Sequence, residues 1–147
     1  MRFALLFAFI TACLMKSVHS CGCEYNFATS CSDGPTEGAK RLAKHFTERF
    51  GGRTEIYNCR KIEGSSTTSL HAEGRAVDLY VTGATGREAF DYAVKIACSN
   101  GIQEAIFNRR IWTSELGEHD YKGVNPHIDH VHIGLNKCGA KSFGAAS

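Results

Sequence analysis

Apolar residues recur at helical spacing in two stretches of the chain. The first follows a helix-start signal at residues 33–37, where proline and an acid stand near the first turn, and it ends at Gly51. The second covers residues 87–98, between a turn at Gly83 and Gly86 and an Asn-Gly pair at 100–101. The apolar faces consist of Ala39, Leu42, Ala43, Phe46 and Phe50, and then of Phe90, Ala93, Val94 and Ala97. The spacing therefore predicts two amphipathic helices.

Strand patterns fill much of the remaining chain, at residues 54–59, 76–82, 103–112 and 130–135. In residues 76–82, Val77, Leu79 and Val81 alternate with other positions, so one face is buried and Asp78 projects from the other. In residues 103–112 the inner-face positions are Ala105, Phe107 and Ile111. The polar segments 61–68 and 113–126 are predicted to be loops. Strands interleaved with two helices predict an α+β fold with a small, largely antiparallel sheet.

The first twenty residues have the pattern of a secretory signal. Arg2 provides the positive charge at the start of a signal peptide, and residues 3–15 form an apolar run too short to span a bilayer. Val18 and Ser20 stand where a signal peptidase requires small side chains. We therefore expect a signal peptide over residues 1–20 and one mature domain over residues 21–147. The mature protein is expected to be secreted, either to the extracellular space or to a periplasm.

Cysteine usage agrees with secretion. Seven cysteines become six once Cys13 leaves with the signal, and an even number in a small secreted chain predicts disulfides. The six are Cys21, Cys23, Cys31, Cys59, Cys98 and Cys138. Many pairings are possible, and the spacing does not choose among them. A cysteine metal site is disfavoured because no C-x-x-C pair occurs.

The charge balance argues against one class of function. Loss of Arg2 and Lys16 with the signal leaves 15 basic residues against 15 acidic ones, so the mature chain has about no net charge. A dedicated nucleic-acid binder normally shows a basic patch or a high isoelectric point. We therefore expect no nucleic-acid partner. No stretch after the first twenty residues is apolar enough to cross a membrane, so we expect a soluble protein without a membrane partner. We also expect a monomer.

Two separated segments carry the residues that a catalytic zinc ion needs. Residues 69–78 contain His71 and Asp78, and residues 129–132 contain Asp129 and His132. Hydrolytic zinc sites combine three nitrogen or oxygen ligands from the protein with an open position for water. We predict His71, Asp78 and His132 as the ligands and Asp129 as the base that takes the proton of the water. The alternative is that His71 and Asp78 form an ordinary ion pair.

The same residues resemble a known family. The pattern S-x-H-x-x-G-x-A-x-D at residues 69–78, followed by D-x-x-H at 129–132, is similar to that of the zinc D-Ala-D-Ala carboxypeptidase family. This family includes L,D- and D,D-peptidases of bacterial peptidoglycan, and the signalling domain of hedgehog proteins shares its fold. The resemblance implies a hedgehog/DD-peptidase-like fold, zinc as the cofactor and a bacterial cell-wall peptide as the substrate. It assigns the same three ligands and the same base.

Two more residues are candidates for the site. Arg60 stands at the end of the predicted strand before the first motif, where the resemblance places an arginine that holds the scissile carbonyl oxygen or the substrate carboxylate. A structural ion pair is the alternative for Arg60. His130 points the same way as His132 in an extended strand, so one of the two is a ligand and the other a neighbour that binds the substrate or the developing oxyanion. The alternative for His130 is a core histidine or one that supports the ligands. The residues expected to be solvated are Glu73, Arg75, His119 and His127.

Two functions of different classes remain open. The favoured one is a secreted zinc metallopeptidase that hydrolyses short peptides, as a D,D-carboxypeptidase or an L-Ala-D-Glu endopeptidase of peptidoglycan. The other is a non-catalytic, zinc-stabilised secreted binding domain like that of hedgehog proteins. Asp129 favours the enzyme, because a binding domain has no need of a base. The sequence does not identify the bond that is cut.

Overall fold

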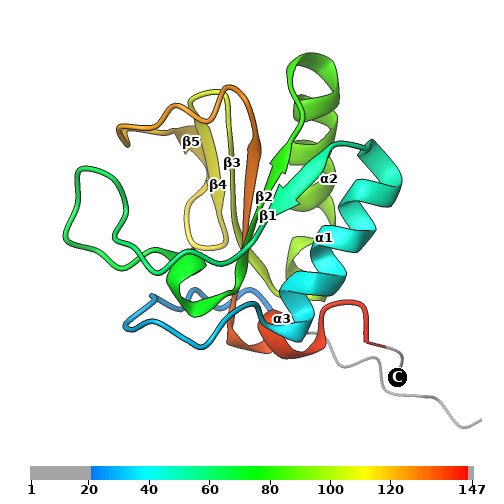
Figure 1. Ribbon diagram of the computed structural model, residues 1–147. Coiled ribbons are helices and arrows are strands. Elements are labelled where there is room, and N and C mark those ends of the chain that lie inside the picture. Colours follow the sequence, from blue (N-terminus) through cyan, green and yellow to red (C-terminus); the bar gives the residue numbers. More distant parts are fainter. Residues whose placement is uncertain (1–20, 146–147) are drawn as a thin grey trace, which may run out of the picture.

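The computed structural model describes residues 21–145 (Figure 1). The predicted signal peptide therefore lies outside the described residues. In chain order the elements are α1 (Glu37–Phe50), β1 (Arg53–Glu55), the 3-10 turn η1 (Leu70–Glu73), β2 (Ala76–Tyr80), α2 (Gly83–Asn100), β3 (Ile102–Phe107), β4 (Arg110–Thr113), β5 (Gly117–Asp120), β6 (Val131–Leu135) and α3 (Lys137–Ser142). The two predicted helices are present as α1 and α2, and α3 is a short third helix.

The strands form one antiparallel sheet in the order β1-β2-β6-β3-β4-β5. The prediction of an α+β fold with a largely antiparallel sheet is confirmed. Strand β6 comes last in the chain but lies in the middle of the sheet, between β2 and β3. The pairing of β6 with β2 brings the second predicted metal-binding segment, residues 129–132, next to the first, residues 69–78.

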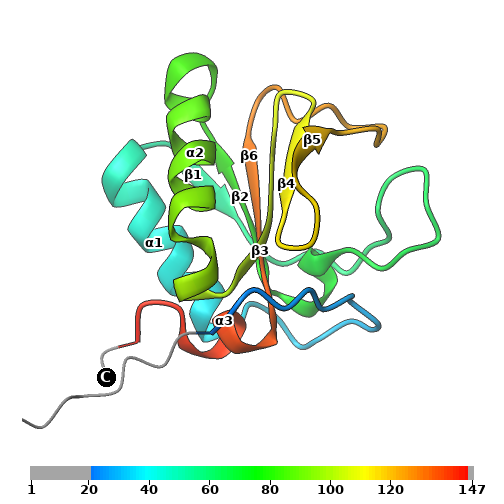
Figure 2. The ribbon, with the colours of Figure 1, turned by 180° about the vertical axis from the view of Figure 1, so that it is seen from behind.

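Helices α1 and α2 cover one face of the sheet, while the loops after β1 and β5 project from the other side (Figures 1 and 2). Alternate residues of the central strands, including Val77, Leu79, Val131 and Ile133, belong to the core under the helices. The intervening residues therefore face the side with the loops. None of the described helices is long and apolar enough to cross a membrane.

The sequence-predicted start of the second helix is wrong. Helix α2 begins at Gly83, four residues earlier than predicted, and Gly86 lies inside it. A Cβ atom at Gly86 would collide with the ring of Phe107 on β3. The glycine thus permits close packing of the helix on the sheet, and it does not mark a turn.

The predicted strand at 103–112 is a hairpin. Asn108 and Arg109 both have positive φ angles, 46° and 63°, and they form the two-residue turn between β3 and β4. The predicted loop at 113–126 contains strand β5, which completes the sheet edge. The first strand ends at Glu55, so Arg60 lies in an irregular segment and not on a strand.

Three disulfides join the described cysteines, as predicted: Cys21–Cys138, Cys23–Cys98 and Cys31–Cys59. The first two tie the N-terminal segment to α3 and α2, and the third ties it to the loop after β1. The N-terminal segment has little regular structure of its own, so these bonds hold it against the sheet. Each such bond in a small domain is worth about 2–5 kcal/mol of stability.

Arg75 links the N-terminal segment to the sheet, and the prediction that it is solvated is wrong. Only 2% of the residue is exposed. Its guanidinium donates hydrogen bonds to the carbonyl oxygens of Leu135 and Asn26, both at 2.5 Å, and to Oε1 of Gln103 at 3.3 Å. Its Nε donates to the carboxylate of Glu73 at 2.6 Å, so the buried charge is paired.

We expect Arg75→Met to lower the free energy of unfolding by about 3–5 kcal/mol, because it leaves a carboxylate and several buried acceptors without their donor. Urea denaturation followed by circular dichroism measures the change. Arg87→Met is the matched control, since Arg87 makes exposed ion pairs with Asp91 and Glu118 that are worth at most about 1 kcal/mol. Equal losses in the two variants would contradict the role given to Arg75.

Candidate metal centre

The 3-10 turn η1 presents the first histidine of the site. Ser69 caps the turn by accepting a hydrogen bond from the backbone N–H of His71 at 3.3 Å. Gly74 ends it in the left-handed region, with φ of 64°, and a Cβ atom there would collide with the backbone of Gly34. The S-x-H-x-x-G spacing therefore encodes a short turn that buries His71 and leads at once into β2.

The other two predicted ligands face each other across neighbouring strands. Asp78 on β2 is opposite His132 on β6 in the antiparallel register. Both side chains leave the sheet on the side away from the helices, because Val77, Leu79, Val131 and Ile133 occupy the helix side. The prediction that Asp78 projects away from the apolar face is confirmed.

The three side chains converge on one point. Nε2 of His71 lies 3.1 Å from Oδ1 of Asp78 and 3.1 Å from Nδ1 of His132, and these last two atoms are 2.9 Å apart. The three ligand atoms therefore form a nearly equilateral triangle in a buried place. One face of a tetrahedron of zinc ligands at about 2.0–2.1 Å has edges of about 3.3 Å. The triangle thus fits a small tetrahedral cation.

The outer nitrogen of each histidine has its own acceptor. Nδ1 of His71 lies 2.5 Å from the carbonyl oxygen of Ile56, and Nε2 of His132 lies 3.0 Å from Oε1 of Glu104. Since each outer nitrogen donates to an oxygen, each neutral ring directs a lone pair inward. Two lone pairs and a carboxylate then meet without a donor among them. Such a set requires a cation or an extra proton at its centre.

The electrostatics of the cluster agree with this requirement. Burial alone would raise the pKa of Asp78, but hydrogen bonds with His132 and His71, which form when an extra proton lies between the three side chains, hold that pKa well below its usual range. Burial alone would lower the pKa of His132, whereas the hydrogen bonds that its protonated ring donates to Asp78 and Glu104 raise that pKa to about 9. Two buried carboxylates thus favour positive charge at the position between the ligands.

Asp129 and His130 form a pair beside the cluster. The carboxylate of Asp129 accepts a hydrogen bond from Nδ1 of His130 at 2.7 Å, and 68% of the Asp129 side chain is exposed. That hydrogen bond lowers the pKa of Asp129. Nε2 of His130 lies 3.8 Å from Oδ1 of Asp78. His130 is therefore the member of the pair that approaches the cluster, with Asp129 behind it.

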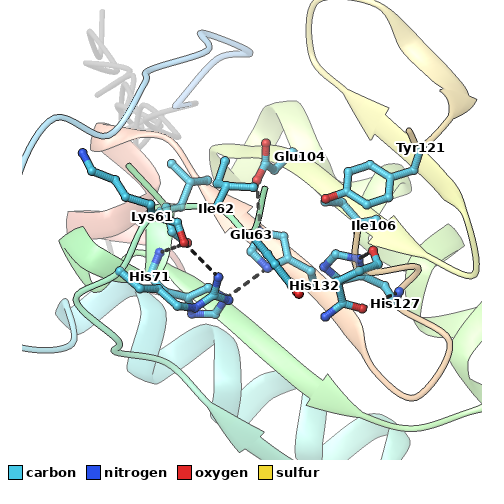
Figure 3. Close-up of a pocket in the computed structure, with 13 residues that line it drawn as sticks. Lys61, Ile62, Glu63, His71, Glu104, Ile106, Tyr121, His127 and His132 are labelled. Atoms are coloured by element: carbon cyan, nitrogen blue, oxygen red, sulfur yellow. Dashed lines mark hydrogen bonds and ion pairs between the residues drawn. The ribbon is translucent and has the colours of Figure 1, made fainter. Parts of the chain in front are cut away.

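A pocket of about 460 Å³ opens over the cluster, with His71 and His132 in its wall. Lys61 and Ile62, from the loop after β1, lie on one side of these histidines, and Tyr121 and His127 lie on the other (Figure 3).

Arg60 is the remaining predicted residue at the pocket, and the two loops beside the pocket approach each other closely. Arg60 lines the pocket as an exposed residue, and its Nη1 donates to the carbonyl of Lys61 at 3.3 Å. Gly64 and Val124 approach each other from the two loops, since a Cβ atom at Gly64 would lie 2.7 Å from Cγ2 of Val124.

His127 belongs to the site, so its predicted surface position is wrong. The residue is only 8% exposed, lines the pocket, and its ring packs against those of His130 and His132. Its φ of 51° turns the chain inward, and its Nδ1 donates to the carbonyl of Asn125 at 2.8 Å. Burial lowers its pKa to about 4, and the neighbouring His132 and His130 add to this effect. The ring is therefore neutral at neutral pH.

Glu104 was not predicted as part of the site. It lies on β3, is 8% exposed, and holds the outer nitrogen of His132. The sequence contains a signal for it, because Glu104 is the one acid among the mostly apolar residues from Ile102 to Phe107. Acids are rarely fully buried unless they are paired, so an acid at that position indicates a partner.

The fold and the cluster define the protein as a disulfide-linked α+β domain with a buried His-Asp-His site on an antiparallel sheet. The model of a family described as VldE, C-terminal domain, matches residues 31–132, which is more than half of the chain and contains all three residues of the cluster. The chain belongs to this family. No curated protein and no solved structure matches it.

Proposed function

We propose that the protein is a zinc-dependent hydrolase of short peptides. The observation that carries the proposal is the triangle of His71 Nε2, Asp78 Oδ1 and His132 Nδ1, three acceptor atoms that meet beside a pocket lined by the two histidines. The ligand set has two imidazoles and one carboxylate, a composition found in catalytic zinc sites, and it leaves the pocket side open. The similarity of these segments to the zinc D-Ala-D-Ala carboxypeptidase family supports the same assignment.

In this proposal His71, Asp78 and His132 hold the zinc ion. When bound, zinc polarises a carbonyl oxygen and lowers the pKa of a water molecule to about 7. The protein's own residues do the remaining work. The Asp129–His130 pair accepts the proton of the attacking water, with Asp129 holding Nδ1 of His130 so that Nε2 faces the cluster. The same pair returns that proton to the leaving amine.

The pocket suits a short peptide with a free carboxylate. Arg60 lies on the rim, where its guanidinium is able to bind a carboxylate or the carbonyl oxygen of the scissile bond. His127 and Tyr121 form the opposite wall. A cell-wall stem peptide or cross-link has this chemistry, so peptidoglycan peptides are the proposed substrates. The disulfides agree with a secreted protein, and we propose that it acts as a monomer.

We expect the purified protein to bind one zinc ion per chain and Asp78→Asn to bind much less, because the substitution removes the only charged ligand. At a free zinc concentration about a hundred times the Kd, binding should stabilise the folded protein by about 2.7 kcal/mol. Metal analysis and thermal unfolding with and without zinc measure both effects. His45→Ala is the control, since His45 is exposed on α1 and should leave zinc binding unchanged. Absence of zinc binding by the wild-type protein would overturn the proposal.

We expect Asp129→Asn to lower kcat/KM by about 10²- to 10⁴-fold, the usual contribution of general-base catalysis, because the pair loses the carboxylate that holds His130. Zinc content and thermal stability should stay at wild-type values, because the Asp129 side chain is largely exposed. Release of amino acids or peptides from peptidoglycan fragments is the assay, and His119→Gln, on β5, is the control. Full activity in Asp129→Asn would show that Asp129 is not needed for the proton transfer.

Chelator treatment separates the peptidase from the alternative function. A peptidase loses cleavage of peptidoglycan fragments when zinc is removed and regains it when zinc is returned. A zinc-stabilised binding domain instead unfolds on chelation and cleaves no fragment before or after. The second result would favour the hedgehog-like binding domain.

A further inference from the structure

Glu104 reaches the metal centre because β3 is irregular. The register of β3 on β6 shifts between Ile102 and Glu104, so that two residues of β3 correspond to a single step on β6. Residues two apart normally share a face, but here Ile102 packs in the core under the helices while Glu104 lies on the site face. The bulge therefore directs the acid toward the metal ligand.

A glycine opposite Glu104 leaves room for its side chain. Gly134 pairs with Glu104 in the register, and a Cβ atom at Gly134 would lie 2.8 Å from Cγ of Glu104. Any larger residue at this position of β6 would press on the carboxylic side chain. The bulge and the glycine thus act together to bring Glu104 alongside His132.

Both carboxylate oxygens of Glu104 have a donor. Oε1 accepts from Nε2 of His132 at 3.0 Å, and Oε2 accepts from the hydroxyl of Tyr25 at 2.5 Å. The side chain is 11% exposed, so these hydrogen bonds replace most of the water that the carboxylate loses. These two hydrogen bonds hold the carboxylate in one orientation. The oriented carboxylate in turn fixes the ring of His132.

Tyr25 is held in place by the segment around it. The neighbouring Asn26 accepts from Arg75 at 2.5 Å through its carbonyl, and its backbone N–H donates to Oε1 of Gln103 at 2.9 Å. The disulfide Cys23–Cys98 fixes the same segment two residues earlier. A rigid support of this kind is what a hydrogen bond needs to orient a metal ligand.

The charges agree with a role toward a divalent ion. Asp78 and Glu104 contribute two negative charges to a site whose histidines present lone pairs, and a doubly charged cation balances them. Without Glu104 the same cation would leave a net positive charge in a buried place. Glu104 therefore favours a divalent over a monovalent occupant.

We propose that Glu104, held by Tyr25, is the positioning residue of the metal centre: it fixes His132 with its Nδ1 lone pair toward the metal and increases the affinity for a divalent cation. This inference rests on the proposed zinc site. It adds a residue outside the predicted ligand set and connects the N-terminal segment to the metal.

The test is the zinc Kd of the full purified protein, measured by competition with a chromophoric chelator. We expect Glu104→Gln to bind zinc about 10- to 100-fold more weakly, the usual effect of losing an outer partner of a metal ligand. Tyr25→Phe should show a smaller loss in the same direction. The double variant should bind no more weakly than Glu104→Gln, because Tyr25 acts through Glu104. Losses that multiply in the double variant would overturn the coupling.

Matched controls and a spectrum separate positioning from general destabilisation. Glu118→Gln and Tyr57→Phe change the same chemical groups away from the cluster and should keep the wild-type Kd. The visible absorption bands of the cobalt-substituted protein should shift in Glu104→Gln and stay unchanged in the controls, because they report the ligand field of the metal. If Glu104→Gln does not fold, the zinc Kd and the cobalt spectrum of Tyr25→Phe test the proposal in its place.

The outcomes distinguish this inference from the proposed function. A wild-type protein that binds no zinc overturns both. Zinc binding in the wild type with an unchanged Kd and spectrum in Glu104→Gln and Tyr25→Phe overturns the positioning role alone. Weaker binding with a shifted spectrum in the variants, and no change in the controls, supports it.

Discussion

The antiparallel pairing of β2 with β6 is the constraint on which the site depends. It sets Asp78 opposite His132, and a slip of one residue would move one of them to the helix-covered face. The register is fixed by the apolar residues that alternate with these two, since each buried aliphatic side chain contributes about 1.5–3 kcal/mol. Burial of a carboxylate costs several kcal/mol unless it is compensated. The core under the helices therefore stabilises a polar cluster that disfavours folding on its own.

Local patterns predicted the parts of the site that depend on local structure. The spacing from Ser69 to Gly74 encodes a capped turn, and strict alternation places Asp78 on the polar face of its strand. Both properties depend on a few residues that are neighbours in the chain, so the sequence alone predicts them. The same holds for the two amphipathic helices, whose apolar faces were correctly identified even though the start of α2 was not.

The features that the sequence did not predict depend on distant partners. Arg75 is buried where its guanidinium donates hydrogen bonds to the carbonyl oxygens of Asn26 and Leu135, which are distant from it in the sequence. Glu104 faces the cluster because of a bulge, and the ring of His127, a residue with a left-handed backbone angle, is buried against those of His130 and His132. Disulfide pairing likewise depends on which segments the sheet brings together. None of these arrangements has a local signature, although a lone acid in an apolar strand was a usable hint.

The close approach of Gly64 and Val124 has a consequence for the two loops beside the pocket. The two loops approach this closely because residue 64 has no side chain, and its φ of 73° favours glycine as well. The separation of the two loops at this point is thus governed by a residue outside the His71–Asp78–His132 cluster and its hydrogen bonds. The spacing of these loops and the geometry of the His71–Asp78–His132 cluster thus depend on different residues, so a substitution at residue 64 is expected to move the loops while the cluster stays as it is.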